Sequence, residues 1–481
     1  LKAAGASAAE IAAEKENIRF AWRPMEAGRR LQDLLTEFAL TIHSPRFTPR
    51  FLNLFLRTYR QHADHILHNY SKQGNHLLFE AQRMLFAGIY FPEFREAQEW
   101  RRSGIEILNR EIGVQVYPDG MQFELDFGYH IAAIDIFLKA LGMARANGYE
   151  GEFPASYIET VGKMTAVTWN QLFPDWSNPM FGDTKSHDKS SLQRQFRSWS
   201  KVFPGDKQLQ WFATEGRKGA LPDYTSQQFP ESGFYVLRTG WDKNATVTVV
   251  KAGPPAFWHN QPDNGTFELW HRGRNFFPDS GCYVYAGDKE VTDQRNWFRQ
   301  TQVHNTLTLD GRNLEHTDSK CLRWETDDAT HIVTVGNPSY EGLTHRRTVW
   351  FVDRQFFVIA DEASGTAEGE VGLHYNLVEC DPAEDFAACS AATRFSDGNN
   401  LLLKVFGAER MERRKGWVSR TYRQRTERPA YAFTVRKRAG KPVRLVTVLL
   451  PAEDAAAQRV EAVWRGNRLQ VKINGTKYNL K

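Results

Sequence analysis

The stretch KGALPDYTSQQFPESGF, residues 218–234, separates two parts of the sequence whose apolar residues repeat with different periods. In the part before it, segments such as residues 49–70 carry apolar residues three and four apart, as amphipathic helices do. In the part after it, segments such as residues 345–363 alternate apolar and polar residues, as half-buried strands do. The separating stretch is polar and rich in Pro, Ser and Gly, which is typical of a linker. We therefore predict an all-α domain over residues 1–225 and an antiparallel β-domain over residues 226–481.

Each domain has an expected architecture. The helices of the first part are similar in length and punctuated by prolines, which favours either an antiparallel bundle or a helical toroid. The second part reads as roughly a dozen short strands without intervening helices, which predicts a large antiparallel sandwich. Its turns contain Asp-Gly, Arg-Gly-Asn and Asn-Gly, which suit hairpins.

Length and charge limit the classes of function. A chain of 481 residues is too long for one ordinary core, which agrees with two domains. The net charge of +5 is compatible with an anionic partner but lacks the strong bias of a nucleic-acid-binding arm, so we expect no nucleic-acid partner. No apolar run approaches the roughly 18 residues of a membrane span. The four cysteines form no CxxC pair, which argues against a cysteine zinc site. The sequence begins at Leu1 with neither Met nor a signal peptide, so we expect a processed chain or a piece of a longer one.

Polar residues stand at the start of one predicted helix, in SKQGNHLLFEA, residues 71–81. Asn75 and His76 follow Gly74 there. Because Asn is a favoured N-cap residue, the residues alone favour a capping role for Asn75 and no special role for His76.

A second polar stretch is YPDGMQFELDFGYHIAAIDIF, residues 117–137. It can be a loop with solvated acids, Glu124 and Asp126, followed by a helix in which Tyr129 is half buried. Alternatively, Asp119 or Glu124 can serve as the acid and base of a glycoside hydrolase, or Tyr129 can be a proton donor. The residues leave these three interpretations open.

A third polar stretch, FWHNQPDNGTFELW at residues 257–270, lies among the predicted strands. Residues 262–265 read as a turn, while His259 and Gln261 alternate onto one face of the chain. Further along, Asp279 and His304 stand at strand edges. With Gln261 or His259 they could form a metal site of mixed nitrogen and oxygen ligands, although their spacing is not a compact motif.

These stretches together resemble the heparinase III-type polysaccharide lyases of the heparinase II/III superfamily. The resemblance rests on GNHLLFEA, on PDGMQFELDFGYH, on residues 257–311, from FWHNQPDNGTFELW through WFRQTQVHNTLTLDG, and on residues 345–363. It covers nearly the whole chain. It implies an α/α toroid joined to an antiparallel β-sandwich. Because the family has more helices before this point, we expect part of the toroid to be missing here or to lie upstream in the intact protein.

The resemblance also implies a lyase that cleaves heparan sulfate, in low-sulfated, glucuronate-containing regions, by β-elimination to unsaturated uronate products. In that chemistry Asn75 matches a neutral donor to the uronate carboxylate, which stabilises the enolate-like intermediate. Tyr129 matches the proton donor to the leaving oxygen, and as a phenolate it could also take the C5 proton. His259 matches a histidine that acts as the general base or assists charge neutralisation. We expect His76, Gln73 and Glu124 to contact the substrate.

The resemblance further implies a divalent metal ion held by Gln261, Asp279 and His304. Gln261 stands where some relatives have His, which shifts the expected ion from zinc or manganese toward calcium. We expect the ion to be structural, and we expect no organic cofactor. The resemblance points to a monomer located in the periplasm or secreted. The alternatives are a lyase for another uronate polymer such as alginate, a non-catalytic polysaccharide-binding protein, and an inverting hydrolase.

Overall fold

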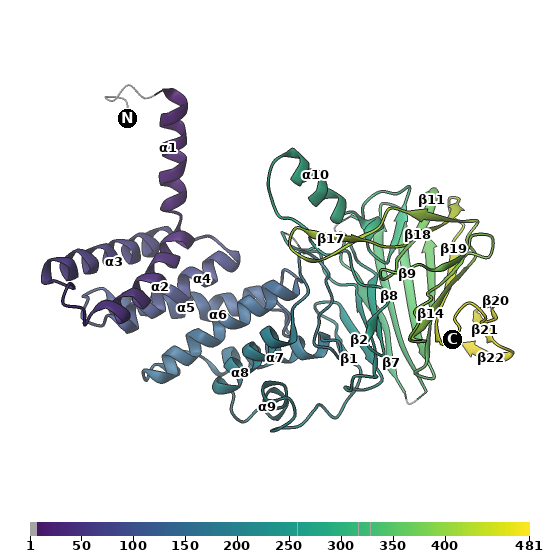
Figure 1. Ribbon diagram of the computed structural model, residues 1–481, viewed down its shortest axis with the longest axis horizontal. Coiled ribbons are helices and arrows are strands. Elements are labelled where there is room, and N and C mark those ends of the chain that lie inside the picture. Colours follow the sequence, from purple (N-terminus) through teal and green to yellow (C-terminus); the bar gives the residue numbers. More distant parts are fainter. Residues whose placement is uncertain (1–6, 257, 316, 328) are drawn as a thin grey trace. The chain divides into compact units, whose positions relative to one another are not determined.

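The computed structural model describes residues 7–256, 258–315, 317–327 and 329–481 (Figure 1). The chain forms two compact units, and they do not follow the order of the sequence. The first unit comprises Leu1–Gly120 and Ile131–Met164, and the second comprises Met121–His130 and Thr165–Lys481. The second unit thus takes a ten-residue segment, 121–130, from the helical part of the chain.

The first half of the described chain is helical, as its 3.6-residue period predicts, and this prediction is confirmed. Its elements are α1 (Ala8–Ala21), α2 (Pro24–Thr41), α3 (Pro49–Asn69), α4 (Gly74–Tyr90), α5 (Ala97–Gln115), α6 (Phe127–Ala146), the 3-10 turn η2 (Glu150–Glu152), α7 (Ala155–Gln171), α8 (Lys189–Val202) and α9 (Lys207–Thr214). Helices α6 and α7 each contribute residues to both units.

Helices α4 and α5 pack against each other through small residues. A Cβ atom on Gly88 of α4 or Gly104 of α5 would collide with the backbone of the other helix, so both positions require glycine for this close approach. The buried face of α4 includes Leu77, Ala81 and Met84, at helical spacing. The start of α4 is therefore fixed in the first unit by its packing on α5.

Helix α6 is, among the described residues, the one helix long and apolar enough to cross a membrane by length and composition. However, 56% of its most apolar window is buried inside the protein, which is also the pattern of a core helix.

The second half is rich in strands. They are β1 (Gln227–Phe229), β2 (Phe234–Arg238), β3 (Thr246–Lys251), β4 (Thr266–His271), β5 (Arg274–Asn275), β6 (Leu307–Leu309), β7 (Lys320–Thr326), β8 (Thr330–Tyr340), β9 (Leu343–Val352), β10 (Phe356–Ser364), β11 (Gly369–Asn376), β12 (Ala383–Asp385), β13 (Ser390–Ala392), β14 (Asn400–Phe406), β15 (Arg410–Arg414), β16 (Trp417–Thr421), β17 (Gln424–Glu427), β18 (Ala430–Lys437), β19 (Val443–Ala452), β20 (Val460–Arg465), β21 (Arg468–Ile473) and β22 (Thr476–Leu480).

The expectation that no helix interrupts these strands is wrong. Helix α10 (Lys289–Phe298) and the 3-10 turn η3 (Thr301–Val303) lie between β5 and β6. Asp288 caps α10 by accepting a hydrogen bond from the Val291 backbone N–H. Only Phe298 is buried along α10, so the helix lacks the apolar period by which the other helices are recognised.

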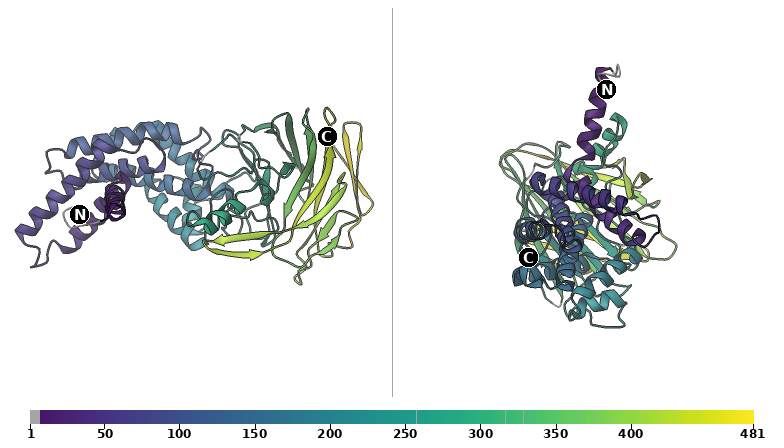
Figure 2. Two further views of the ribbon diagram at one scale, coloured as in Figure 1. Left: turned by 90° about the horizontal axis from the view of Figure 1, so that it is seen from above. Right: turned by 90° about the vertical axis from the view of Figure 1, so that its left-hand side faces the viewer.

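The strands form an antiparallel sandwich, which confirms the predicted architecture. An eight-stranded sheet has the order β12-β13-β14-β19-β10-β9-β8-β7, and a four-stranded sheet has the order β15-β18-β11-β6. Figure 2 shows the green and yellow strands of these sheets side by side. Alternation along β10 explains the layers: Phe357 and Ile359 join a core shared with β11 and β18, while Phe356 and Val358 face a second core shared with β20 and β21.

A buried ion pair ties this sandwich to the loop before β4. Arg347 and Asp361 lie on the neighbouring strands β9 and β10, with 2.7 Å between Arg347 Nε and an Asp361 oxygen. Burial raises the pKa of Asp361, but the Arg347 guanidinium and the hydrogen bond with His345 together outweigh that effect, so the pKa lies below its usual value. Arg347 also donates to the backbone carbonyls of Gly265 and Asn305, so it fixes two segments that flank the candidate site.

Candidate active site

Tyr129 and His259 meet in the second unit. Their rings are stacked, with centroids 3.7 Å apart and an angle of 14° between the planes. Tyr129 lies in the first turn of α6, where its backbone N–H donates to the Asp126 carboxylate at 3.0 Å. His259 lies in the loop between β3 and β4, and its carbonyl accepts a hydrogen bond from the Asp183 N–H. Two of the predicted catalytic residues are therefore in contact, although they are far apart in sequence.

Asp183 orients the imidazole of His259. The distance from His259 Nδ1 to an Asp183 oxygen is 3.0 Å, and Arg295 of α10 donates to the same oxygen at 2.6 Å. Burial raises the pKa of Asp183, but the hydrogen bond from His259 and the charge of Arg295 outweigh it, so the pKa lies below its usual value. Asp183 is therefore a carboxylate, and its contact with Nδ1 favours the tautomer in which that nitrogen carries the proton and Nε2 can accept one.

Glu124 lies at the other nitrogen of the same ring. One of its carboxyl oxygens is 3.5 Å from His259 Nε2, and the residue is only 2% exposed. Burial raises the pKa of Glu124 to about 7, an effect that the proximity of His259 partly opposes. Asp126 is also buried, at 1% exposed, so the interpretation of these two residues as solvated loop acids is wrong.

The surroundings keep the Tyr129 phenol protonated. Burial, together with the nearby carboxyls of Asp126 and Glu124, raises the pKa of Tyr129 above its ordinary value. Tyr285 stands beside the pair, with its ring edge-on to His259 and its hydroxyl donating to the Asp183 carbonyl at 2.9 Å. The cluster therefore combines a phenol that can give a proton with an imidazole that can take one.

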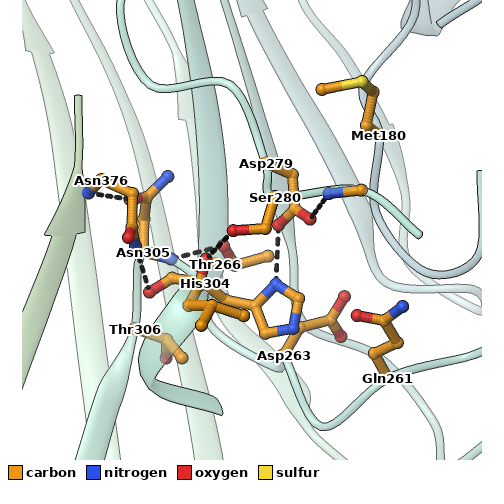
Figure 3. Close-up of polar contacts among 12 residues, drawn as sticks. Met180, Gln261, Asp263, Thr266, Asp279, Ser280, His304, Asn305, Thr306 and Asn376 are labelled. Atoms are coloured by element: carbon orange, nitrogen blue, oxygen red, sulfur yellow. Dashed lines mark hydrogen bonds and ion pairs between the residues drawn. The ribbon is translucent and has the colours of Figure 1, made fainter. Parts of the chain in front are cut away.

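The three predicted metal ligands lie in the same unit (Figure 3). His304 Nδ1 is 2.7 Å from an Asp279 oxygen, and the ring lies between Asp279 on one side and Gln261 and Asp263 on the other. Burial lowers the pKa of His304, but the Asp279 carboxylate outweighs it and raises the pKa.

Orphaned polar atoms test whether this place fits a cation. Within the described part of the chain, Gln261 Oε1, His304 Nε2 and Asp263 Oδ1 are buried and have no hydrogen-bond partner. Buried polar atoms are rarely left unsatisfied, so two oxygens and one nitrogen of this kind fit a hard or borderline cation. The searched residues contain no group of three or more His, Cys, Asp or Glu side chains placed to hold a metal, so an ion here depends on the amide of Gln261.

Asp263 lies in the expected turn, where its carbonyl accepts a hydrogen bond from the Thr266 N–H at 2.8 Å, and its side chain is buried. It is 1% exposed, and its other carboxyl oxygen lies 2.7 Å from the ammonium of Lys251, which is also fully buried. Lys251 also donates to the Asn260 side chain at 2.6 Å. Gln261 donates to Asp183 and to the Gly182 carbonyl, so Gln261 and His259 both contact Asp183. This agrees with the expectation that the two side chains lie on one face of the chain.

The remaining predicted residues lie in the first unit, at the start of α4. Gln73 is the N-cap residue but makes no side-chain cap hydrogen bond, and Asn75 is the second residue of the helix. The capping role for Asn75 is therefore wrong. Gln115 of α5 donates to the Gly74 carbonyl at 3.2 Å, which anchors the turn that carries Asn75. His76 and Gln73 are exposed, and Asn75 is half buried.

Sequence reasoning missed Asp183, and it did not foresee the contact between Arg295 and Asp183 or the ion pair between Asp263 and Lys251. Asp183 follows the irregular stretch PMFG, and its partner His259 lies 76 residues further along the chain, so no local spacing joins them. The position of Arg295 could not be predicted because the sequence of α10 has no helical repeat of apolar residues. The Asp288 N-cap was the one local signal that could have revealed this helix.

Comparison with known proteins agrees with this arrangement. The family model described as Heparinase II/III N-terminus matches residues 6–211, and the one described as Heparinase II/III-like, C-terminal matches residues 222–458. A heparin-sulfate lyase of Bacteroides stercoris is 49% identical over 481 residues, which cover 98% of this chain and 72% of that protein.

Solved structures give the same result. A heparinase III structure superposes with a TM-score of 0.90 at 50% identity, and the match covers 99% of this chain and 76% of that chain. The heparan sulfate lyase HepC from Pedobacter heparinus has a TM-score of 0.86 at 43% identity, covering 96% of this chain and 75% of that chain. Both halves of the chain are matched, and the chain belongs to the heparinase II/III family.

Proposed function

We propose that this protein is a lyase that cleaves heparan sulfate, in its low-sulfated, glucuronate-containing regions, by β-elimination. The observation that carries the proposal is the stacked pair of Tyr129 and His259, set among the buried carboxyls of Glu124 and Asp183. Near full-length similarity to proteins named heparin-sulfate lyase supports the same substrate class.

The chemistry requires one base and one acid. A base removes the proton from C5 of the uronate, the electron pair forms a C4–C5 double bond, the C4–O4 bond breaks, and an acid gives a proton to O4. In this proposal Nε2 of His259 accepts the C5 proton, because Asp183 keeps the other nitrogen protonated. Tyr129 gives its proton to O4, since its raised pKa keeps the phenol protonated in the free protein.

The uronate carboxylate also needs neutralisation, because removing the C5 proton builds negative charge beside it. We assign this role to the amide of Asn75, a neutral donor that does not titrate. His76, Gln73 and Glu124 are proposed substrate contacts. Glu124, which lies at His259 Nε2, could also receive the proton that this nitrogen takes.

We also propose a divalent ion, calcium in preference to zinc or manganese, with a structural role. Gln261 and His304 would hold it, and Asp279, which positions His304, belongs to the same set. Asp263 offers one further oxygen. Such an ion would neutralise buried carboxylates and fix the loop that presents His259. We place the protein, as a monomer, in the periplasm or outside the cell, where an intact polysaccharide is accessible.

A panel of polymers tests the proposal. Heparan sulfate, heparin and alginate are each incubated with the protein while the ultraviolet absorbance of the unsaturated uronate is followed. The proposal expects absorbance to rise fastest with heparan sulfate. A rise with alginate alone would assign the chemistry to another substrate, and new reducing ends without absorbance would indicate a hydrolase.

A further inference from the structure

The hairpin β16–β17 and its flanks carry an unusual concentration of positive charge. Residues 410–428 contain eight basic residues, Arg410, Arg413, Arg414, Lys415, Arg420, Arg423, Arg425 and Arg428, against two acidic ones, Glu412 and Glu427. Some of these cations are neutralised: Arg420 pairs with Glu379, and Arg413 pairs with Glu384. The whole chain has a net charge of only +5, so this surface is locally far more basic than the rest.

Three cations of the hairpin and its flank are exposed, and in the described structure none of them forms an ion pair with a carboxylate. They are Lys415, Arg423 and Arg425. Lys185, from the loop that carries Asp183, is a fourth exposed cation of this kind, and its ammonium lies 5.9 Å from the Tyr422 ring. Unneutralised charges of one sign repel each other and attract an oppositely charged partner.

Aromatic rings hold these cations in place. Lys415 Nζ lies 4.0 Å and Arg425 Cζ lies 3.6 Å from the centroid of the Trp417 ring. Trp417 in turn packs on Trp297 of α10, with centroids 4.7 Å apart (Figure 1 shows β17 beside α10). Cations ordered on aromatic faces lose less conformational entropy on binding than mobile surface lysines do.

The hairpin is joined directly to the candidate active site. The Tyr422 ring stacks on Tyr285 at 5.9 Å, and Tyr285 in turn stands edge-on to His259 at 6.1 Å. The backbone N–H of Ser186 donates to the Arg420 carbonyl at 3.2 Å, which links the hairpin to the segment that follows Asp183. The rings of Tyr422 and Tyr285 therefore connect the basic hairpin to His259.

We propose that Lys185, Lys415, Tyr422, Arg423 and Arg425 form a binding surface for the sulfated or carboxylated chain that extends beyond the uronate being cleaved. The inference rests on the proposed function, because it takes the ligand to be the same anionic polysaccharide. Guanidinium groups pair well with planar or tetrahedral oxyanions, and lysine adds point charges. The surface binds the polymer and does not take part in proton transfer.

The test compares two triple variants that remove the same charge. The first is Lys415→Gln, Arg423→Gln, Arg425→Gln, and the matched control is Arg438→Gln, Lys441→Gln, Lys477→Gln, three exposed cations of the same unit without a carboxylate partner in the described structure. Because exposed charge pairs each contribute modestly, the hairpin variant is expected to raise KM for heparan sulfate about tenfold, with a smaller effect on kcat. The rise should be smaller for a short oligosaccharide, and it should shrink as salt screens the charges.

Binding is measured separately, by retention on immobilised heparan sulfate in the His259→Ala background. The hairpin variant should elute at lower salt than the control, with an unchanged melting temperature. Equal elution and equal KM for the two variants would overturn the inference. If no unsaturated product forms with the unmutated protein, the proposed function fails, while the binding comparison still decides the role of the hairpin.

Discussion

Replacing Asp183 with Asn tests how the catalytic histidine is held. The carboxylate is 1% exposed and accepts three side-chain donors: His259 at 3.0 Å, Arg295 at 2.6 Å and Gln261 at 3.1 Å. An amide has a single acceptor oxygen, so its NH₂ group would face at least one of these donors. The Arg295 charge would also lose its partner.

Two effects of different size follow. Breaking a buried ion pair costs about 3 kcal/mol of unfolding free energy, less here because Arg295 is partly exposed. Loss of the correct tautomer and orientation of the base should lower kcat by about 10²-fold or more, since positioned general bases contribute about that much. KM should change little, because Asp183 is buried behind His259.

The assay follows unsaturated product at a temperature where the variant is folded, and ¹⁵N NMR reports which nitrogen of His259 carries the proton. Arg295→Gln serves as the control, because it weakens the same buried cluster but leaves the bond between Asp183 and His259. We expect the control to lose stability with a much smaller change in kcat. The reasoning is refuted if folded Asp183→Asn keeps kcat within about threefold of the unmutated protein, far less than a lost base would cost.

Three further predictions concern the donor, the pH dependence and the ion. Asn75→Ala should lower kcat by about 10²–10³-fold with little loss of stability, as kinetics and thermal melting will report, because a preorganised donor is removed and no helix cap is lost. Burial lowers the pKa of His374 to about 3, below that of an unfolded histidine, so this residue's contribution to stability is lost as pH falls below about 6.5. Denaturation at pH 7 and at pH 5 should show that the unfolding free energy of the unmutated protein falls by about 2 kcal/mol more than that of His374→Gln. Equal falls for the two proteins would contradict the lowered pKa of His374. Chelation should lower the melting temperature of the unmutated protein but not of His304→Ala, whereas activity that depends on added metal at unchanged melting would argue against a structural ion.

The succession of a helical part and a strand-rich part could be predicted because the spacing of apolar residues is a local property of the sequence. Helices such as α3 and strands such as β10 keep their characteristic spacing of apolar residues over many positions. The Pro- and Ser-rich stretch between them lies where the helical spacing gives way to strand alternation. Helix α10 was not predicted because its single buried residue, Phe298, leaves no repeat of apolar residues along the helix.

The candidate site was only partly predictable for a related reason. The family resemblance pointed to Tyr129 and His259, but nothing local in the sequence reveals that Asp183 or Glu124 faces the imidazole. Those contacts depend on the folded path of distant segments. The turn at Asp263 was predicted, but its ion pair with Lys251 was not, because Lys251 looks like an ordinary polar residue of a strand. Partners of this kind become visible only when burial and distance are known.

The most direct test of the central claim is the reaction of the protein and its Tyr129→Phe variant with heparan sulfate. The change removes only the phenolic oxygen and keeps the ring that stacks on His259. We predict that the unmutated protein produces ultraviolet absorbance from unsaturated uronate, while the variant melts at the same temperature and produces almost none. A variant that turns over heparan sulfate at nearly the unmutated rate would contradict the assignment of Tyr129 as the proton donor.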